Sequence, residues 1–291
     1  MEKRTFIPGS EWVYFKLYTG AKTADMILIN ELYEYIKEMV DNDIIDKWFY
    51  IRYADPDFHI RLRLHLKSIQ NFNYIFKRFF ETFQHTADSS YVWNIQCDTY
   101  QREIERYGDN SISLVEDLFF IDSEYAIRLL HHLNEDNPEE HRWKLALLMI
   151  DSLLAVFSYD LPQKKELLNT ISDNFKKEFG FTYHDASKQL NDKYRNYRKK
   201  IEQAMSSENE TSKTNEIIKA RKHDLLPMAN ILTAMNKTGE LSVDLNALLT
   251  SIIHMSMNRW FRSRNRLHEL VIYDFLSRYY SSELAKLKKI S

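Results

Sequence analysis

Hydrophobic and polar residues alternate most regularly between Trp48 and Leu66. Successive side chains of a strand point to opposite faces, so the second half of this stretch has one cationic and one aliphatic side. The cationic side carries His59, Arg61, Arg63 and His65, and the aliphatic side carries Ile60, Leu62, Leu64 and Leu66. A proline-containing turn at residues 55–57 separates this run from the one before it. The stretch is therefore predicted to be a β-hairpin.

The cationic side of the hairpin has two interpretations. Like charges in a row repel each other, so such a side usually lies in solvent, and the pattern alone favours this location. Alternatively, it forms the floor of a cleft that holds an anion. Arg61 and Arg63 are spaced by two residues, and their planar forks can then bind carboxylates bidentately.

The elements around the hairpin predict an α+β fold. Residues 11–18 and 91–95 are rich in aromatic and β-branched residues and indicate strands. Helical periodicity follows the first strand, with Thr23 or Asp25 as its cap, and returns over residues 69–83, whose aromatic residues are expected in the core. This order predicts an N-terminal sandwich of sheet and helices, with a helix on the apolar sheet face.

The rest of the chain is predicted to be helical. Ser111 or Ser113 caps a helix that extends to about residue 132. Beyond it, helical patterns cover 139–158, 162–179, 184–205, 214–235, 244–261 and 263–280, and the polar segment 206–214 is predicted to be a mobile loop. We therefore expect an α+β portion, 1–136, and a mostly α-helical C-terminal half, 137–291, as parts of one integrated domain.

Composition narrows the function classes. The 40 Lys and Arg residues balance 42 Asp and Glu residues, so the chain lacks the overall positive field that non-specific binding to nucleic acid or membranes needs. It has no signal peptide and no run of about 20 apolar residues, which favours the cytoplasm and no membrane span. The single cysteine, Cys97, excludes an internal disulfide. We expect it to be a small buried strand residue.

Three groups of polar residues are candidates for chemistry. They are His59, Arg61 and Arg63 in the hairpin; Tyr100, Arg102, Glu103, Arg106 and Tyr107 in YQREIERY; and His254, Asn258 and Arg259 in HMSMNRW. Each group also has a structural explanation, because arginines pair with nearby carboxylates and a half-buried histidine is often satisfied by one hydrogen bond. Histidine spacings suited to a metal and a G-x-S-x-G motif are absent from the sequence.

The sequence resembles the C-terminal glutamate-elimination domain of class I lantibiotic dehydratases, also described as the thiopeptide-type bacteriocin biosynthesis domain. The resemblance is carried by WVYFKLYTG at 12–20, FYIRYADPDFHIRLRL at 49–64, YQREIERYG at 100–108 and HMSMNRW at 254–260. The order and spacing of these motifs extend over nearly the whole chain.

The resemblance implies a lyase that acts on a ribosomally made precursor peptide. In that family a partner domain esterifies Ser or Thr side chains with glutamate from glutamyl-tRNA. The elimination domain then removes the α-proton and expels glutamate, which leaves dehydroalanine or dehydrobutyrine. By motif position, the resemblance implies Arg61, Arg63, Arg102 and His254 as catalytic residues. It implies no metal, nucleotide or redox cofactor.

These residue types suit the chemistry, because removal of an amide α-proton needs a base beside fixed positive charge. His254 is the candidate base and the three arginines are the candidate clamp for carboxylates. The expected substrate-binding residues are Arg52, His59, Tyr100, Arg106, Asn258 and Arg259. Tyr53 or Tyr100 could share the proton transfer, so the identity of the base stays open.

The expected partners are the precursor peptide and a separate glutamylating dehydratase subunit, because the resemblance begins almost at Met1. The resemblance also implies self-association as a homodimer. Two alternatives stay open. One is a thiopeptide-type cyclase that joins two dehydroalanines, although such relatives tend to lose the arginines and the histidine. The other is a non-catalytic partner that binds the precursor peptide at a strand edge.

Overall fold

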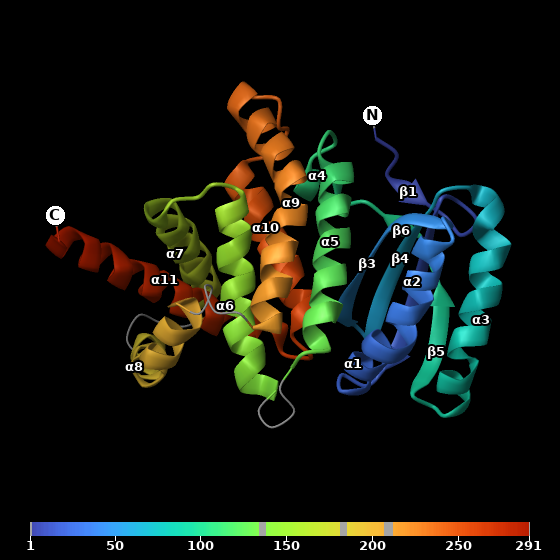
Figure 1. Cartoon of the computed structure of the whole chain (residues 1–291), viewed down its shortest axis with the longest axis horizontal. Coiled ribbons are helices and arrows are strands. Elements are labelled where there is room, and N and C mark those ends of the chain that lie inside the picture. Colours follow the sequence, from blue (N-terminus) through green and yellow to red (C-terminus); the bar gives the residue numbers. More distant parts are fainter. Residues whose placement is uncertain (1, 134–137, 181–184, 207–211, 291) are drawn as a thin grey trace. The chain divides into compact units, whose positions relative to one another are not determined.

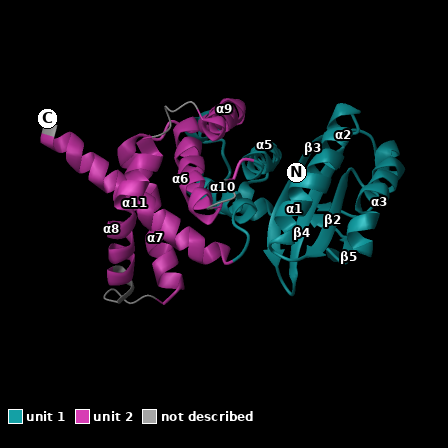
Figure 2. Cartoon of the chain, turned by 60° about the horizontal axis from the view of Figure 1, so that its bottom comes forward, with its two compact units in different colours: residues 1–131, 234–263 teal, residues 132–233, 264–291 magenta. Residues whose placement is uncertain are grey.

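The computed structural model describes residues 2–133, 138–180, 185–206 and 212–290. Its contacts divide the chain into two compact units, 1–131 with 234–263 and 132–233 with 264–291 (Figure 2). The helix that carries His254 therefore belongs to the same unit as the hairpin. The division into domains at residues 136 and 137 stays a prediction.

The strands of the first unit form an antiparallel sheet in the order β3-β4-β2-β5 and a short ladder of β1 with β6. Their bounds are β1 Thr5–Phe6, β2 Trp12–Thr19, β3 Ile45–Ala54, β4 Phe58–Leu66, β5 Val92–Cys97 and β6 Tyr100–Gln101. With the helices between them, the four main strands follow the split-βαβ order of ferredoxin-like folds. The predicted hairpin is β3 and β4.

Helices cover the aliphatic side of this sheet. The helical elements of the first unit are α1 Thr23–Ile27, a π-helical turn Leu28–Leu32, α2 Tyr33–Asp41, a 3₁₀ turn Ile69–Asn71, α3 Phe72–Asp88, α4 Ile104–Tyr107, α5 Ile112–Leu130 and α10 Leu245–Trp260. Figure 1 shows α2 and α3 beside the sheet. The Phe79 ring of α3 stacks on Phe15 of β2 with centroids 4.0 Å apart, and Leu62 and Leu64 of β4 are fully buried. The prediction of a helix on the apolar face is confirmed.

The predicted cap of α1 is wrong, whereas Ser111 is the N-cap residue of α5 as predicted. Lys22 occupies the N-cap position of α1 and makes no side-chain capping bond. Asp25 instead binds Arg52 and Arg262, because a buried guanidinium needs a carboxylate more than the helix end needs a cap. Ser111 holds the N-cap position of α5, but its hydroxyl donates to the carbonyl of Tyr107.

The second unit consists of helices in the residues that the structure describes. They are α6 Pro138–Val156, α7 Leu161–Glu178, α8 Asp185–Ser206, most of α9 Lys213–Thr238, and α11 Asn265–Ile290. Together with the sheet of the first unit, these helices confirm the predicted α+β fold class.

The predicted loop at 206–214 falls largely outside the described residues. Among the described helices, none is long and apolar enough to cross a membrane.

Cys97 is exposed, so the expectation of a buried strand residue is wrong. It ends β5, which is an edge strand of the sheet. Beside it, α3 leaves a hollow of about 290 Å³ that Cys97, Ile95 and Phe80 help to line. Phe80 is 62% exposed, so the aromatic residues of 69–83 are only partly in the core.

Candidate active site

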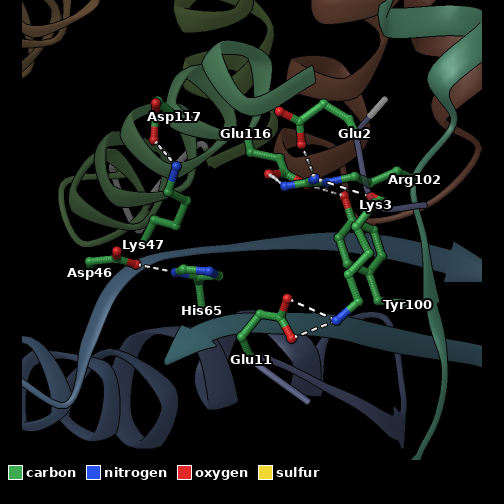
Figure 3. A network of polar contacts seen from close by, with 10 residues as sticks. All are labelled: Glu2, Lys3, Glu11, Asp46, Lys47, His65, Tyr100, Arg102, Glu116 and Asp117. Carbon is green, nitrogen blue, oxygen red and sulfur yellow. Dashed lines mark hydrogen bonds and ion pairs between the residues drawn. The ribbon is translucent and has the colours of Figure 1, made fainter. Parts of the chain in front are cut away.

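The cationic side of β4 is largely covered by protein. His59 is fully buried, Arg63 is 8% exposed, and Arg61 is half-buried. His65, at the other end of the row, has its Nδ1 atom 2.6 Å from Asp46 Oδ1 (Figure 3). The interpretation of a solvent-facing row is therefore wrong for His59 and Arg63. The neighbouring strands place aromatic residues opposite both of them.

Arg63 is a buried cation within a cage of aromatic rings. Its Cζ atom lies 4.6 Å from the ring centroid of Tyr14, 4.9 Å from that of Tyr100 and 5.2 Å from that of Phe49. Its Nε atom is buried and has no hydrogen-bond partner in the described part of the chain. Cation–π contacts contribute about 0.5–2 kcal/mol each, which does not replace a counter-ion for a desolvated charge. The cage therefore favours an anion beside Arg63.

Arg61 is held by two neighbours on the same side of the sheet. Its Nε–H group donates to His59 Nε2 at 3.0 Å, and its Cζ atom lies 3.4 Å from the ring centroid of Tyr53. Since guanidinium can only donate, His59 Nε2 is the acceptor and its Nδ1 carries the hydrogen. That hydrogen is donated to the Asp57 carbonyl at 2.8 Å. Both ring nitrogens of His59 are thus occupied.

His59 is electrically neutral near neutral pH. Burial lowers the pKa of His59 below its ordinary value of 6.5, and the charges of Arg61 and Lys16 lower it further, although the Asp57 carbonyl opposes them. A buried, neutral imidazole that is already bonded on both sides contacts Arg61 rather than solvent. The predicted role of His59 as a substrate ligand has no exposed atom to support it.

This lowered pKa predicts acid sensitivity of folding. Above about pH 6.5 both the folded and the unfolded chain hold His59 neutral, so its contribution to the free energy of unfolding is fully present. As pH falls below that value, the unfolded chain gains a proton first and the contribution is lost. When the pH is lowered from 8 to 5, we expect the urea midpoint of the wild type to fall by more than that of His59→Gln. A difference that stays constant with pH would contradict this expectation.

Arg102 forms an ion pair with the buried carboxylate of Glu116 (Figure 3). Its Nε and Nη2 atoms donate to Glu116 at 2.7 and 2.6 Å, and the Tyr100 hydroxyl donates to the same carboxylate at 2.8 Å. Its Nη1 atom donates to the Glu2 carboxylate at 3.0 Å and to the Lys3 carbonyl at 3.2 Å. Glu116 is fully buried. Only the Nη1 side of Arg102 therefore has partners that lie near solvent.

The pKa values of this cluster follow from burial and from Glu116. Burial alone would lower the pKa of Arg102, but the hydrogen bonds and charge of Glu116 outweigh it and the pKa is raised. Burial, with the charge of Glu116, raises the pKa of Tyr100 well above its ordinary 10. Tyr100 stays protonated near neutral pH and cannot accept a proton there.

Sequence reasoning missed Glu116. It is a carboxylate at a buried position of the largely apolar α5, and such a residue requires a cationic partner. This requirement was the available signal, but it does not identify which cation would be the partner.

His254 lies half-buried on α10, between two anchoring contacts of that helix. Ser251, three residues before it, accepts a hydrogen bond from Arg106 Nε at 3.1 Å. Asn258, four residues after it, accepts one from the backbone N–H of Arg52 at 3.0 Å. Residues at these spacings share one side of a helix. The side of α10 that carries His254 therefore faces α4 and the edge of β3.

Arg52 and Arg259 hold α10 against the sheet instead of facing a ligand. Arg52 donates from Nε to the Arg259 carbonyl at 2.8 Å and from Nη2 to Asp25 at 2.6 Å. The guanidinium of Arg259 binds Asp122 at 3.0 Å. Both arginines are at most 1% exposed, and Arg52 lies on the opposite side of the sheet from Arg61. Arg52 is thus a fixed cation at the last turn of α10, and it satisfies one of the backbone carbonyls that have no partner within the helix.

The structure thus separates the predicted residues into two sets. Arg61 and Arg63 are cations without a carboxylate partner among the described residues, on one side of the sheet. Arg52, Arg102 and Arg259 are paired internally. Within the described residues no group of three or more His, Cys, Asp or Glu side chains is placed to hold a metal ion.

Comparison with known proteins finds similar proteins over most of the chain. The family model described as "Lantibiotic biosynthesis dehydratase C-term" matches residues 12–280. The nisin biosynthesis protein NisB of Lactococcus lactis subsp. lactis is 24% identical over 98% of this chain, which spans only 27% of NisB.

Two solved structures have the same fold. The tRNA-dependent lantibiotic dehydratase MibB from Microbispora sp. 107891 superposes on 92% of this chain with a TM-score of 0.71 and 15% identity, and the match covers 28% of MibB. The pyridine synthase TbtD from thiomuracin biosynthesis superposes on 94% with a TM-score of 0.67 and 10% identity, and the match covers 99% of TbtD. At these identities the likeness concerns the fold alone.

Proposed function

Because this chain belongs to the lantibiotic biosynthesis dehydratase C-terminal family, we propose that it eliminates glutamate from glutamylated Ser and Thr side chains of a ribosomally made precursor peptide. The observation that carries the proposal is the pair of guanidinium groups on β4 that form no ion pair with a carboxylate among the described residues. Arg63 is buried without a carboxylate among the described residues, and Arg61 leaves its terminal nitrogens without a protein partner there. A site with two unpaired cations favours an anionic ligand.

The proposed step is a β-elimination. His254 takes the α-proton of the esterified residue, the electrons of the Cα–H bond form the Cα=Cβ double bond, and the Cβ–O bond breaks. Glutamate leaves as a carboxylate, and dehydroalanine or dehydrobutyrine remains. Arg61 holds the free carboxylate of the glutamyl group in the substrate and in the transition state alike, and Arg63 stabilises the negative charge on the enolate-like amide and on the leaving carboxylate. The step as written uses no metal, nucleotide or redox cofactor.

Arg102 has a more limited role in this proposal than a free clamp would have. Glu116 occupies two of its nitrogens, so a substrate carboxylate reaches it only at Nη1, where Glu2 now binds. Arg102 and Glu116 also fix the hydroxyl of Tyr100, whose ring is one wall of the Arg63 cage. We propose that Arg102 shapes the surroundings of Arg63.

This chain spans 27% of the length of NisB, and we propose that other machinery makes the glutamate ester. We propose a glutamylating dehydratase subunit and the precursor peptide as partners. Self-association as a homodimer stays a prediction.

The test is mass spectrometry of a leader-bearing peptide with one glutamyl-serine ester, incubated with this protein alone. We expect loss of the whole glutamate and formation of dehydroalanine, while a serine peptide without the ester stays unchanged. Free serine as the product would indicate simple ester hydrolysis and contradict the proposal. An unchanged ester, with consumption of a peptide that carries two dehydroalanines, would favour the cyclase.

A further inference from the structure

We propose that His59 is a positioning residue that turns Arg61 so that it receives a carboxylate through its two terminal nitrogens. The inference rests on the proposed function, because the carboxylate is that of the glutamyl ester. It adds a role for a residue that touches no substrate, and it defines the direction from which the anion approaches.

The first observation is the hydrogen bond that uses Arg61 Nε. A guanidinium binds a carboxylate either from its side, through Nε and one terminal nitrogen, or from its end, through both terminal nitrogens. His59 Nε2 occupies the Nε–H group at 3.0 Å and thereby blocks the side approach. Because His59 is fully buried and bonded to the Asp57 carbonyl at 2.8 Å, its ring has a fixed orientation.

The second observation is the aromatic support beneath the pair. The guanidinium of Arg61 lies 3.4 Å from the ring centroid of Tyr53. The ring of His59 packs 4.6 Å from that of Tyr18 and 5.6 Å from that of Tyr53, by centroids. Tyr18 and Tyr53 lie opposite His59 on the two neighbouring strands. The sheet register therefore places the Tyr53 ring against the guanidinium of Arg61 and packs the ring of His59 between Tyr18 and Tyr53.

The third observation concerns the atoms left over. Arg61 makes one hydrogen bond among the described residues, through Nε, and its side chain is half-buried. The neighbouring cation, Lys16, is already paired with Asp98. The two terminal nitrogens of Arg61 are thus the donors available for a planar anion at this end of the sheet, and a carboxylate fits their spacing.

A pair of variants of similar polarity tests the inference. In His59→Gln the longer side chain can still place an acceptor near Arg61 Nε, whereas in His59→Asn it cannot reach that far. For elimination from the ester peptide we expect KM to rise roughly tenfold in His59→Asn, as for one lost charge-assisted hydrogen bond, with kcat changed less than about threefold. His59→Gln should restore KM to near the wild-type value. Equal KM values for wild type and a folded His59→Asn would overturn the proposal.

A second readout does not depend on activity. In nitrogen-15 NMR of the arginine Nε–H groups, the slowly exchanging signal of Arg61 is assigned by its absence in Arg61→Lys. This signal should also be absent in His59→Asn but retained in His59→Gln. If the wild type does not eliminate glutamate while this pattern holds, the proposed function fails and the positioning role stands. If elimination occurs but the Arg61 signal is unaffected by His59→Asn, the positioning role is wrong. Matching unfolding midpoints at pH 8 confirm that each variant is folded.

Discussion

Replacement of His254 by alanine is expected to lower the elimination rate by about 10²–10⁴-fold, the range usual for loss of a general base. His254 is half-buried on α10, on the side that faces α4 and the edge of β3. Asn258 and the carbonyl of Arg259 hold the helix against Arg52 of β3. The rate of dehydroalanine formation under single-turnover conditions measures the effect, and peptide affinity should change little.

His223→Ala is the matched control for His254→Ala. His223 is a strongly exposed histidine in the second unit, with a side chain that is 86% exposed, so its removal should leave the rate unchanged. If His254→Ala eliminated glutamate as fast as the wild type, the base would have to be another group, and Tyr53 beside Arg61 would be the next candidate.

Removal of the Glu116 side chain is expected to be the most destabilising single change at the site. Glu116→Ala leaves Arg102 as a buried charge without its main counter-ion and leaves the Tyr100 hydroxyl without its acceptor. Breaking a buried ion pair in this way costs about 3–5 kcal/mol of the free energy of unfolding. Urea unfolding at pH 7.5, followed by circular dichroism, measures it.

The double variant Glu116→Ala with Arg102→Met separates the cost of the uncompensated charge from the loss of packing. It should recover part of the lost stability, because no buried charge then lacks a partner. Glu105→Ala is the control, since this exposed carboxylate pairs with Arg4 at the surface and its loss should leave the midpoint close to that of the wild type. A Glu116→Ala midpoint equal to the Glu105→Ala midpoint would contradict the role assigned to Glu116.

The residues proposed for the reaction and the residues that stabilise the fold around them are largely different. His254 and Arg61 should affect the reaction more than folding, whereas Glu116 should affect folding first. Arg102 belongs to both sets, because it binds Glu116 on one side and presents Nη1 on the other. Its substitution is therefore expected to lower both activity and stability, and the two effects have to be measured separately.

The sequence by itself determined the local elements. The alternation over β4 and the helical periodicities of α3, α6, α7, α9 and α10 each depend on neighbours a few residues apart, so their patterns are legible in a single chain. The α+β class followed from the order of these elements. The motifs at 49–64 and 254–260 also indicate Arg61, Arg63 and His254 as site candidates without any knowledge of tertiary contacts.

Only the tertiary structure decided how each charged residue is used. Arg102 pairs with Glu116, Arg52 with Asp25 and Arg259 with Asp122, whereas Arg61 and Arg63 form no ion pair with a carboxylate in the part of the chain that the structure describes. Such choices depend on contacts between residues far apart in the sequence, and many carboxylates could satisfy each arginine equally well on paper. Once an arginine is buried, its pairing with one particular carboxylate is required for stability, because a charge removed from water needs a partner within hydrogen-bond reach.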